Sequence, residues 1–163
     1  MSDFLKTVAV VAVTLTGFIG VVFVLGRRSE GGLSIHESSA IFHLLYTALG
    51  ALFLSLVASV FLESIIERVF VSQVGNGICG LYLLLGVGMA TAGALRGELG
   101  IPKKVVAWPI LGTTYALIGV NFVVAAGYFP GAAPIVFMIC IVWLLFVATI
   151  TFIGLLPTGR QNA

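Results

Sequence analysis

The stretch APIVFMICIVWLLFVATITFIGLL, residues 133–156, contains no charged side chain. Crossing about 30 Å of hydrocarbon takes roughly 20 helical residues, so this stretch is long enough to span a bilayer. Unpaired backbone groups are not tolerated in lipid, and a helix satisfies them within the segment. Residues 133–156 therefore predict a transmembrane helix and give a template for the rest of the chain.

Four further apolar runs precede this one. Together the five runs cover residues 4–25, 39–62, 77–95, 105–128 and 133–156. Apart from Lys6 near the start of the first run, they carry no Asp, Glu, Lys or Arg between their ends. The connections between them are short. We predict an all-α membrane protein, with residues 1–163 forming a single domain that is a bundle of five transmembrane helices.

The overall composition supports the same conclusion. The chain has 163 residues, of which 60% are hydrophobic and only 9% charged, against roughly 25% charged in an ordinary soluble domain. So few charges could not cover the surface of a soluble protein. The net charge of +2 is too small to suggest nucleic acid as a partner. We expect an integral membrane protein surrounded by lipid, in the plasma membrane of a prokaryote.

The first run could instead be a cleaved signal peptide, because Val24 and Gly26 suit a small-residue cleavage site. Its length, its single positive residue Lys6 and the Arg27 that would follow the cut argue for a retained span. Orientation follows from the positive-inside rule. With the N-terminus outside and the C-terminus inside, only Lys6 and Arg68 lie outside. The other six positive residues then lie inside: Arg27, Arg28, Arg96, Lys103, Lys104 and Arg160.

The second helix has a recognisable start and an extension. Ser34 and Glu37 have the spacing of a capping box, in which each side chain can pair with the other residue's amide. Past residue 62, the sequence ESIIERVF (63–70) continues the helical pattern with an apolar side. This pattern indicates an interfacial segment that extends the second helix. Gly75-Asn76-Gly77 would then turn the chain into the third span.

Small residues at helical spacing indicate where helices meet, because close packing replaces the hydrophobic effect in lipid. The predicted packing residues are Gly86, Ala90 and Ala94 in the third span and Gly112, Gly119 and Ala126 in the fourth. Phe129-Pro130-Gly131 predicts a tight connection between the fourth and fifth spans, with Pro134 in the first turn of the fifth. Pro109 predicts a bend near one end of the fourth span.

Both histidines of the chain lie around the start of the second span. His36 and His43 are seven residues apart and share a helix face. They could bind haem or a metal or relay protons, although two histidines alone do not complete a metal site. Alternatively, His36 is an interfacial residue and His43 bonds to a neighbouring helix. We favour this structural interpretation and predict no cofactor.

Glu63 and Glu67 lie four residues apart and could share a cation near Arg68. The same spacing occurs on any solvated helix face, which is the interpretation we favour. Cys79 and Cys140 lie in separate apolar runs and are interpreted as small packing residues.

Several polar residues fall inside the spans. Five of them could line a path for a small solute, with the Pro109 bend as a gate: Tyr46, Thr47, Thr113, Thr114 and Asn121. More often such residues hold transmembrane helices together.

The sequence contains no motif for nucleophilic, metal-dependent or phosphate chemistry, and we predict that the protein is not an enzyme. The leading hypothesis is an accessory or scaffold subunit of a larger membrane assembly, which contacts other membrane subunits or associates with itself. One alternative is an oligomeric channel or carrier for a small neutral or hydrophobic solute. A weaker alternative is a redox subunit that binds haem or metal through His43.

Overall fold

A computed structural model describes residues 2–27, 35–62, 68–95 and 101–155. These ranges contain no strand. Their helices are α1 (Ser2–Arg27), α2 (Ile35–Leu62), α3 (Arg68–Leu95), α4 (Ile101–Ala125) and α5 (Ala133–Leu155), with a short 3-10 helix η1 (Pro130–Ala132) before α5. All five α-helices are long and apolar enough to cross a membrane, which confirms the predicted all-helical architecture.

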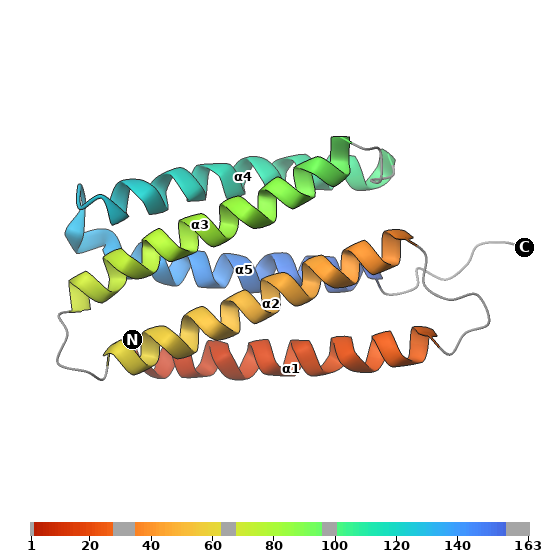
Figure 1. The fold of residues 1–163 in the computed structure, drawn as a ribbon, viewed down its shortest axis with the longest axis horizontal. Coiled ribbons are helices and arrows are strands. Elements are labelled where there is room, and N and C mark those ends of the chain that lie inside the picture. Colours follow the sequence, from red (N-terminus) through yellow and green to blue (C-terminus); the bar gives the residue numbers. More distant parts are fainter. Residues whose placement is uncertain (1, 28–34, 63–67, 96–100, 156–163) are drawn as a thin grey trace, which may run out of the picture.

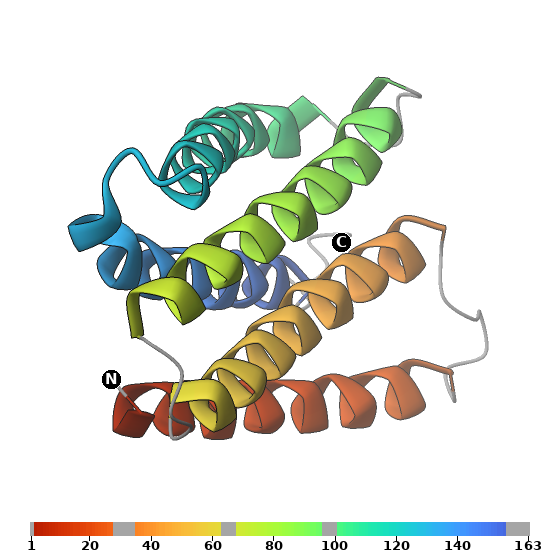
Figure 2. The same ribbon diagram turned by 60° about the vertical axis from the view of Figure 1, so that its left-hand side comes forward.

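Two helical hairpins lie on either side of α5 (Figure 1). Helix α1 packs chiefly on α2, α4 packs chiefly on α3, and α5 contacts both α2 and α3. A second view keeps the same arrangement, with α2 of one pair beside α3 of the other (Figure 2). Helix α5 carries apolar side chains on all sides. Some of them contact the two helix pairs, and others lie on a face that no described helix covers.

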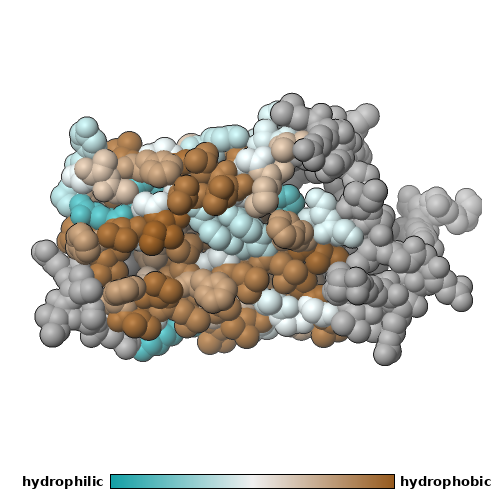
Figure 3. Space-filling view, viewed as in Figure 1, coloured by the Kyte–Doolittle hydropathy of each residue, from teal (hydrophilic) through white to brown (hydrophobic). Residues whose placement is uncertain are grey.

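The side chains on the outside of the bundle are mostly apolar. Val10 and Val60 are 66% and 67% exposed, and brown, hydrophobic residues dominate the face seen in Figure 3. Inside, Phe137, Ile141 and Leu144 of α5 are at most 2% exposed. An exposed apolar surface of this extent would be a liability in water, whereas a lipid environment accommodates it.

The third helix begins earlier than the sequence predicted. The prediction that residues 63–70 extend the second helix is wrong for Val69 and Phe70, because both belong to α3; residues 63–67 lie outside the described residues. The predicted turn at residues 75–77 is also wrong, since the helix runs through it. Asn76 is fully buried, and an ideal Cβ at Gly75 would lie 2.8 Å from the Phe137 ring. Close packing, not a turn, is what these residues provide.

The connection between α4 and α5 is a tight one, as predicted. Helix α4 ends at Ala125, and Gly127 has a φ of 87° that suits glycine. The predicted fourth span therefore extended slightly too far. Pro130 then begins η1, and Pro134 lies in the first turn of α5, where its missing amide hydrogen costs no helical bond. Helix α4 runs through Pro109.

Candidate functional site: polar contacts between helices

The most specific contact between the two hairpins joins Tyr46 of α2 to Tyr82 of α3. Their rings stack with centroids 4.2 Å apart and planes 8° from parallel. The Tyr46 hydroxyl donates to the Tyr82 carbonyl at 2.8 Å, and the Tyr82 hydroxyl donates to the Tyr46 carbonyl. The contact is therefore reciprocal, which fixes both the distance and the register of α2 and α3.

Two glycines make this contact possible. An ideal Cβ at Gly50 would lie 2.3 Å from Cε1 of Tyr82, and one at Gly86 would lie 2.9 Å from Cε1 of Tyr46. Helical side chains lean toward the N-terminus, so in an antiparallel pair each ring covers the residue four positions after the other tyrosine. We call Tyr46, Gly50, Tyr82 and Gly86 the tyrosine clasp.

The glycines also explain why a backbone carbonyl can accept the hydroxyl. In an α-helix the carbonyl of residue i accepts from the amide of residue i+4, so Gly50 and Gly86 supply the helical donors to the two tyrosine carbonyls. Without a side chain at i+4, the second lone pair of each carbonyl stays open to a donor from the neighbouring helix. Tyrosine followed four residues later by glycine is thus one structural unit, used twice.

Asn76 joins α3 to the start of α5. Its side-chain Nδ2 donates to the carbonyl of Ser72 at 2.7 Å and to the carbonyl of Ala133 at 2.8 Å. Both acceptors are carbonyls, so only the NH₂ group can face them. The Oδ1 atom is buried and has no hydrogen-bond partner among the described residues. Asn76 was missed as a buried carboxamide because the sequence placed it in a turn.

Two more polar contacts join neighbouring helices. The indole Nε1 of Trp143 in α5 donates to Thr114 Oγ1 of α4 at 3.0 Å. Thr114 in turn donates to the Ile110 carbonyl in its own helix. Thr91 of α3 and Tyr115 of α4 share a hydrogen bond of 3.1 Å between their oxygens. Each of these contacts connects helices that already pack together, as the structural interpretation of the polar residues expects.

The five residues predicted to line a solute path do not come together on one route. Tyr46 is in the clasp, and Thr47 donates to the His43 carbonyl of its own helix at 2.9 Å. On α4, Thr113 is exposed while Thr114 and Asn121 are buried. Helices α3 and α5 lie between α2 and α4 (Figure 1).

Asn121 differs from Asn76 although both are fully buried. Its Nδ2 donates only to Leu117 in the preceding turn of α4, at 2.8 Å. Its Oδ1 also has no partner within the described ranges. An ideal Cβ at Gly80 of α3 would lie 3.4 Å from the Asn121 Cβ, so this carboxamide is packed against α3 without a polar bond to it.

Two of the candidate ligand residues, His36 and His43, lie in α2. His43 is half-buried, with its ring edge-on to Phe42 at a centroid distance of 6.3 Å. His36 lies in the first turn of α2, and a shared site with His43 stays a prediction. Ser34, Glu63 and Glu67 lie outside the described residues. Within the described ranges, no three His, Cys, Asp or Glu residues are grouped so that they could hold a metal ion.

Some of the small residues predicted to pack between helices face the interior, and others are exposed. Gly86 belongs to the clasp, and Ala90 packs partly buried against the core; the side chain of Ala94 is not described. Gly112, Gly119 and Ala126 are exposed, and nothing lies within 4 Å of an ideal Cβ at either glycine. These three residues of the predicted fourth span are therefore not part of the interior of this chain. Among the α4 residues with described side chains, the buried ones are instead Leu111, Thr114, Ile118, Asn121 and Val124.

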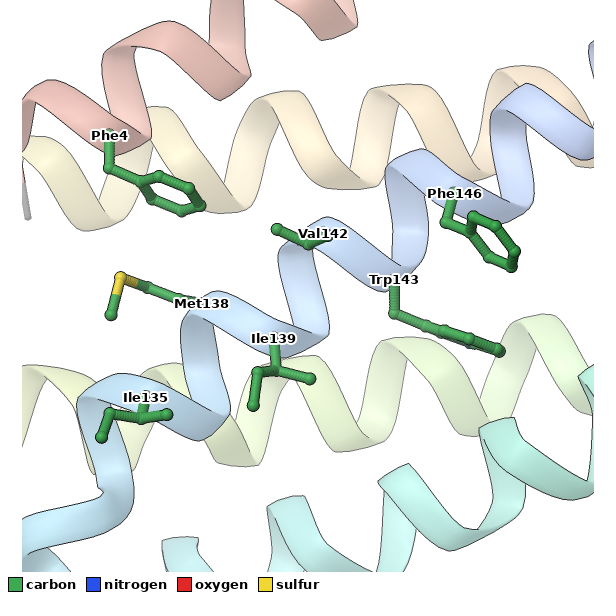
Figure 4. A pocket seen from close by; sticks show the side chains of 7 residues that line it. All are labelled: Phe4, Ile135, Met138, Ile139, Val142, Trp143 and Phe146. Atoms are coloured by element: carbon green, nitrogen blue, oxygen red, sulfur yellow. The ribbon is translucent and has the colours of Figure 1, made fainter.

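An open, apolar groove of about 560 Å³ runs along the uncovered face of α5. Phe4 of α1 forms one wall, as Figure 4 shows. Trp143 lies in this groove with its ring 5.3 Å from that of Phe146, and its only polar atom is bonded to Thr114. The α5 residues that line the groove are Ile135, Met138, Ile139, Val142, Trp143 and Phe146. The groove surface is almost entirely apolar and includes the Met138 thioether.

Comparisons with known proteins add no functional assignment. A scan against protein-family models, a search of curated proteins and a search of solved structures each found no significant match.

Proposed function

We propose that this chain is a structural membrane subunit, which stabilises or positions another helical membrane protein by lateral contact. The polar bonds within the bundle are the main support. Tyr46, Asn76 and Trp143 each donate to a neighbouring element, α3, α5 and α4 respectively. Side chains that could bind a solute are thus used to hold helices together, which suits a scaffold better than a carrier.

The outer surface offers two features that suit contact with a partner. Gly112 and Gly119 leave shallow positions on exposed α4, where a helix of another protein can approach closely. The groove beside α5 can accept bulky apolar side chains such as those that dominate lipid-facing helices.

The two alternative functions have weaker support. A solute path would need its lining residues on one route, whereas Tyr46 lies between α2 and α3, Thr113 is exposed and Asn121 is buried. A redox role for His43 would need a second ligand, and no metal-holding group of three occurs in the described ranges.

Gentle extraction from native membranes tests the proposal. The tagged chain is purified in a mild detergent, and its native mass and its co-purifying proteins are measured at defined stoichiometry. Three single variants, Gly112→Leu on α4, Ile139→Trp on α5 and Val60→Trp on α2, then alter three exposed surfaces. Each substituted residue is exposed in the chain alone, so the fold of each variant should be intact.

The proposal predicts one partner at fixed stoichiometry, lost in at least one of the variants and retained in the others. It is contradicted if the native mass is that of the chain alone or of a homo-oligomer. A homo-oligomer that also gives liposomes permeability to a small neutral solute, lost in Asn121→Leu, would favour the carrier instead.

A further inference from the structure

Two contacts fix how α3 and α5 lie beside each other. The two helices run in the same direction (Figure 1). Asn76 of α3 donates to the carbonyl of Ala133 at the start of α5, and Gly75 lies against the ring of Phe137. One helical turn further along each helix brings the chain to Cys79 and to Cys140. The register of the two helices therefore places these cysteines opposite each other.

The burial of the two side chains agrees with this register. Both cysteines are free thiols, both are 0% exposed, and both belong to the same core cluster. The α3 and α5 helices that carry them pack directly against each other. The sequence interpretation of each cysteine as a separate packing residue did not foresee this pairing, because the residues lie in different spans.

We propose that Cys79 and Cys140 form a reversible disulfide that links α3 to α5, with a lipid-soluble quinone as the oxidant. A disulfide needs two Cα atoms within about 4.4–6.8 Å and side chains directed at each other. The register of α3 against α5 and the shared core cluster are the observations that favour this arrangement. Nothing in the proposed structural role depends on this bond, so the two proposals stand or fall separately.

The apolar environment of the thiols suits an oxidant that dissolves in lipid. Thiol–disulfide exchange in water proceeds through a thiolate, and a charge without a partner is costly in an apolar core. A quinone takes up two hydrogen atoms overall. Two S–H bonds break, one S–S bond forms, and the quinone is reduced to a hydroquinone with two new O–H bonds. The net reaction therefore leaves no charge in the core, and local opening of the packed helices admits the oxidant.

The test uses the full chain reconstituted in phosphatidylcholine vesicles. Duroquinone is added, because its ring is fully substituted and does not alkylate thiols. The protein is then denatured, its free thiols are labelled with a maleimide, and its intact mass is measured. We expect the monomer to lose both reactive thiols and two hydrogen atoms of mass, with one hydroquinone formed per chain. A phosphine reductant should restore both thiols.

Two variants control for position. Cys140→Ser should keep its single thiol as a monomer. The double variant Cys79→Ala with Ile78→Cys keeps two cysteines but moves one to a position that is 49% exposed and faces away from Cys140. It should form no disulfide within the chain. The proposal is overturned if wild type keeps both thiols, whatever the variants do. It is equally overturned if the relocated pair forms an intramolecular disulfide as readily as the native pair.

Discussion

The contact between α2 and α3 is close and polar, whereas the groove between α1 and α5 is open and apolar. In the tyrosine clasp, two rings, two hydroxyls and two glycines fit in one arrangement. In the groove, Phe4 and the α5 side chains leave about 560 Å³ open, and nearly all of the groove surface is apolar. In lipid, apolar side chains gain little by exchanging lipid for each other, whereas notches and polar bonds are specific. Stability should therefore be concentrated at the clasp and nearly absent at the groove.

The largest effect should come from filling a notch of the clasp. Gly50→Leu puts a side chain where the Tyr82 ring lies, since even a Cβ would be 2.3 Å from a ring atom. We expect a loss of about 3 kcal/mol in the free energy of unfolding, the upper end for overpacking. The measurement is unfolding by dodecyl sulfate in mixed micelles. The matched control is Gly17→Leu on α1, where nothing lies within 4 Å.

The control should change the free energy by about 1 kcal/mol at most, in the stabilising direction, because leucine is the better helix former. Equal losses in the two variants would show that the clasp is not a special site.

A smaller effect is expected at Asn76. Asn76→Leu removes the bond from α3 to the Ala133 carbonyl, and we expect a loss of about 1–2 kcal/mol on the same measurement. Asn121→Leu is the matched variant, because Asn121 is equally buried but bonds only within its own helix. Its loss should be below about 0.5 kcal/mol, and a gain is consistent because its Oδ1 has no partner among the described residues. The reverse order would contradict this assignment of the two carboxamides.

The hydroxyls of the clasp should contribute less than its shape. Tyr46→Phe and Tyr82→Phe each remove one hydrogen bond between helices and leave the rings stacked. Such bonds average about 0.6 kcal/mol in a membrane protein, and we expect about that loss in each variant. The two losses should agree within error because the contact is reciprocal. A large loss in one variant and none in the other would show that the two bonds are not equivalent.

The smallest effect is expected in the groove. Ile139 is 51% exposed, and Ile139→Ala should change the free energy of unfolding of the isolated chain by less than about 0.5 kcal/mol. A loss of several kcal/mol would mean that the groove contributes to the fold, and would remove the contrast with the clasp.

The sequence was most informative where hydropathy alone decides the structure. Uninterrupted apolar runs predicted five helices, and the start of α5 at Ala133 matches the structure. The start of α3 could not be predicted in the same way, because glycine and asparagine have the same local preference whether they turn the chain or pack inside it. Only the position of the Phe137 ring and of the Ala133 carbonyl decides between these roles for Gly75 and Asn76.

The spacing of small residues predicts which of them share a helix face, but it does not predict what that face contacts. Gly86 and Gly112 both belong to small-residue stripes, yet the first lies under the Tyr46 ring and the second faces outward. The signal that could have identified the clasp was its repetition, since Tyr46 and Tyr82 are each followed by glycine four residues later. The pairing of Cys79 with Cys140 had no such signal, because it depends on the register of α3 against α5.

The placement of α5 between two hairpins has a consequence for biosynthesis. Synthesis proceeds from the N-terminus, so both hairpins leave the ribosome before the helix that lies between them. During that interval, the direct contacts between α2 and α3, which include the paired tyrosine rings, are what can keep the two halves in register. In this order of events, α5 packs last against two hairpins whose spacing the stacked rings already hold. The rings then act during assembly as well as in the folded protein.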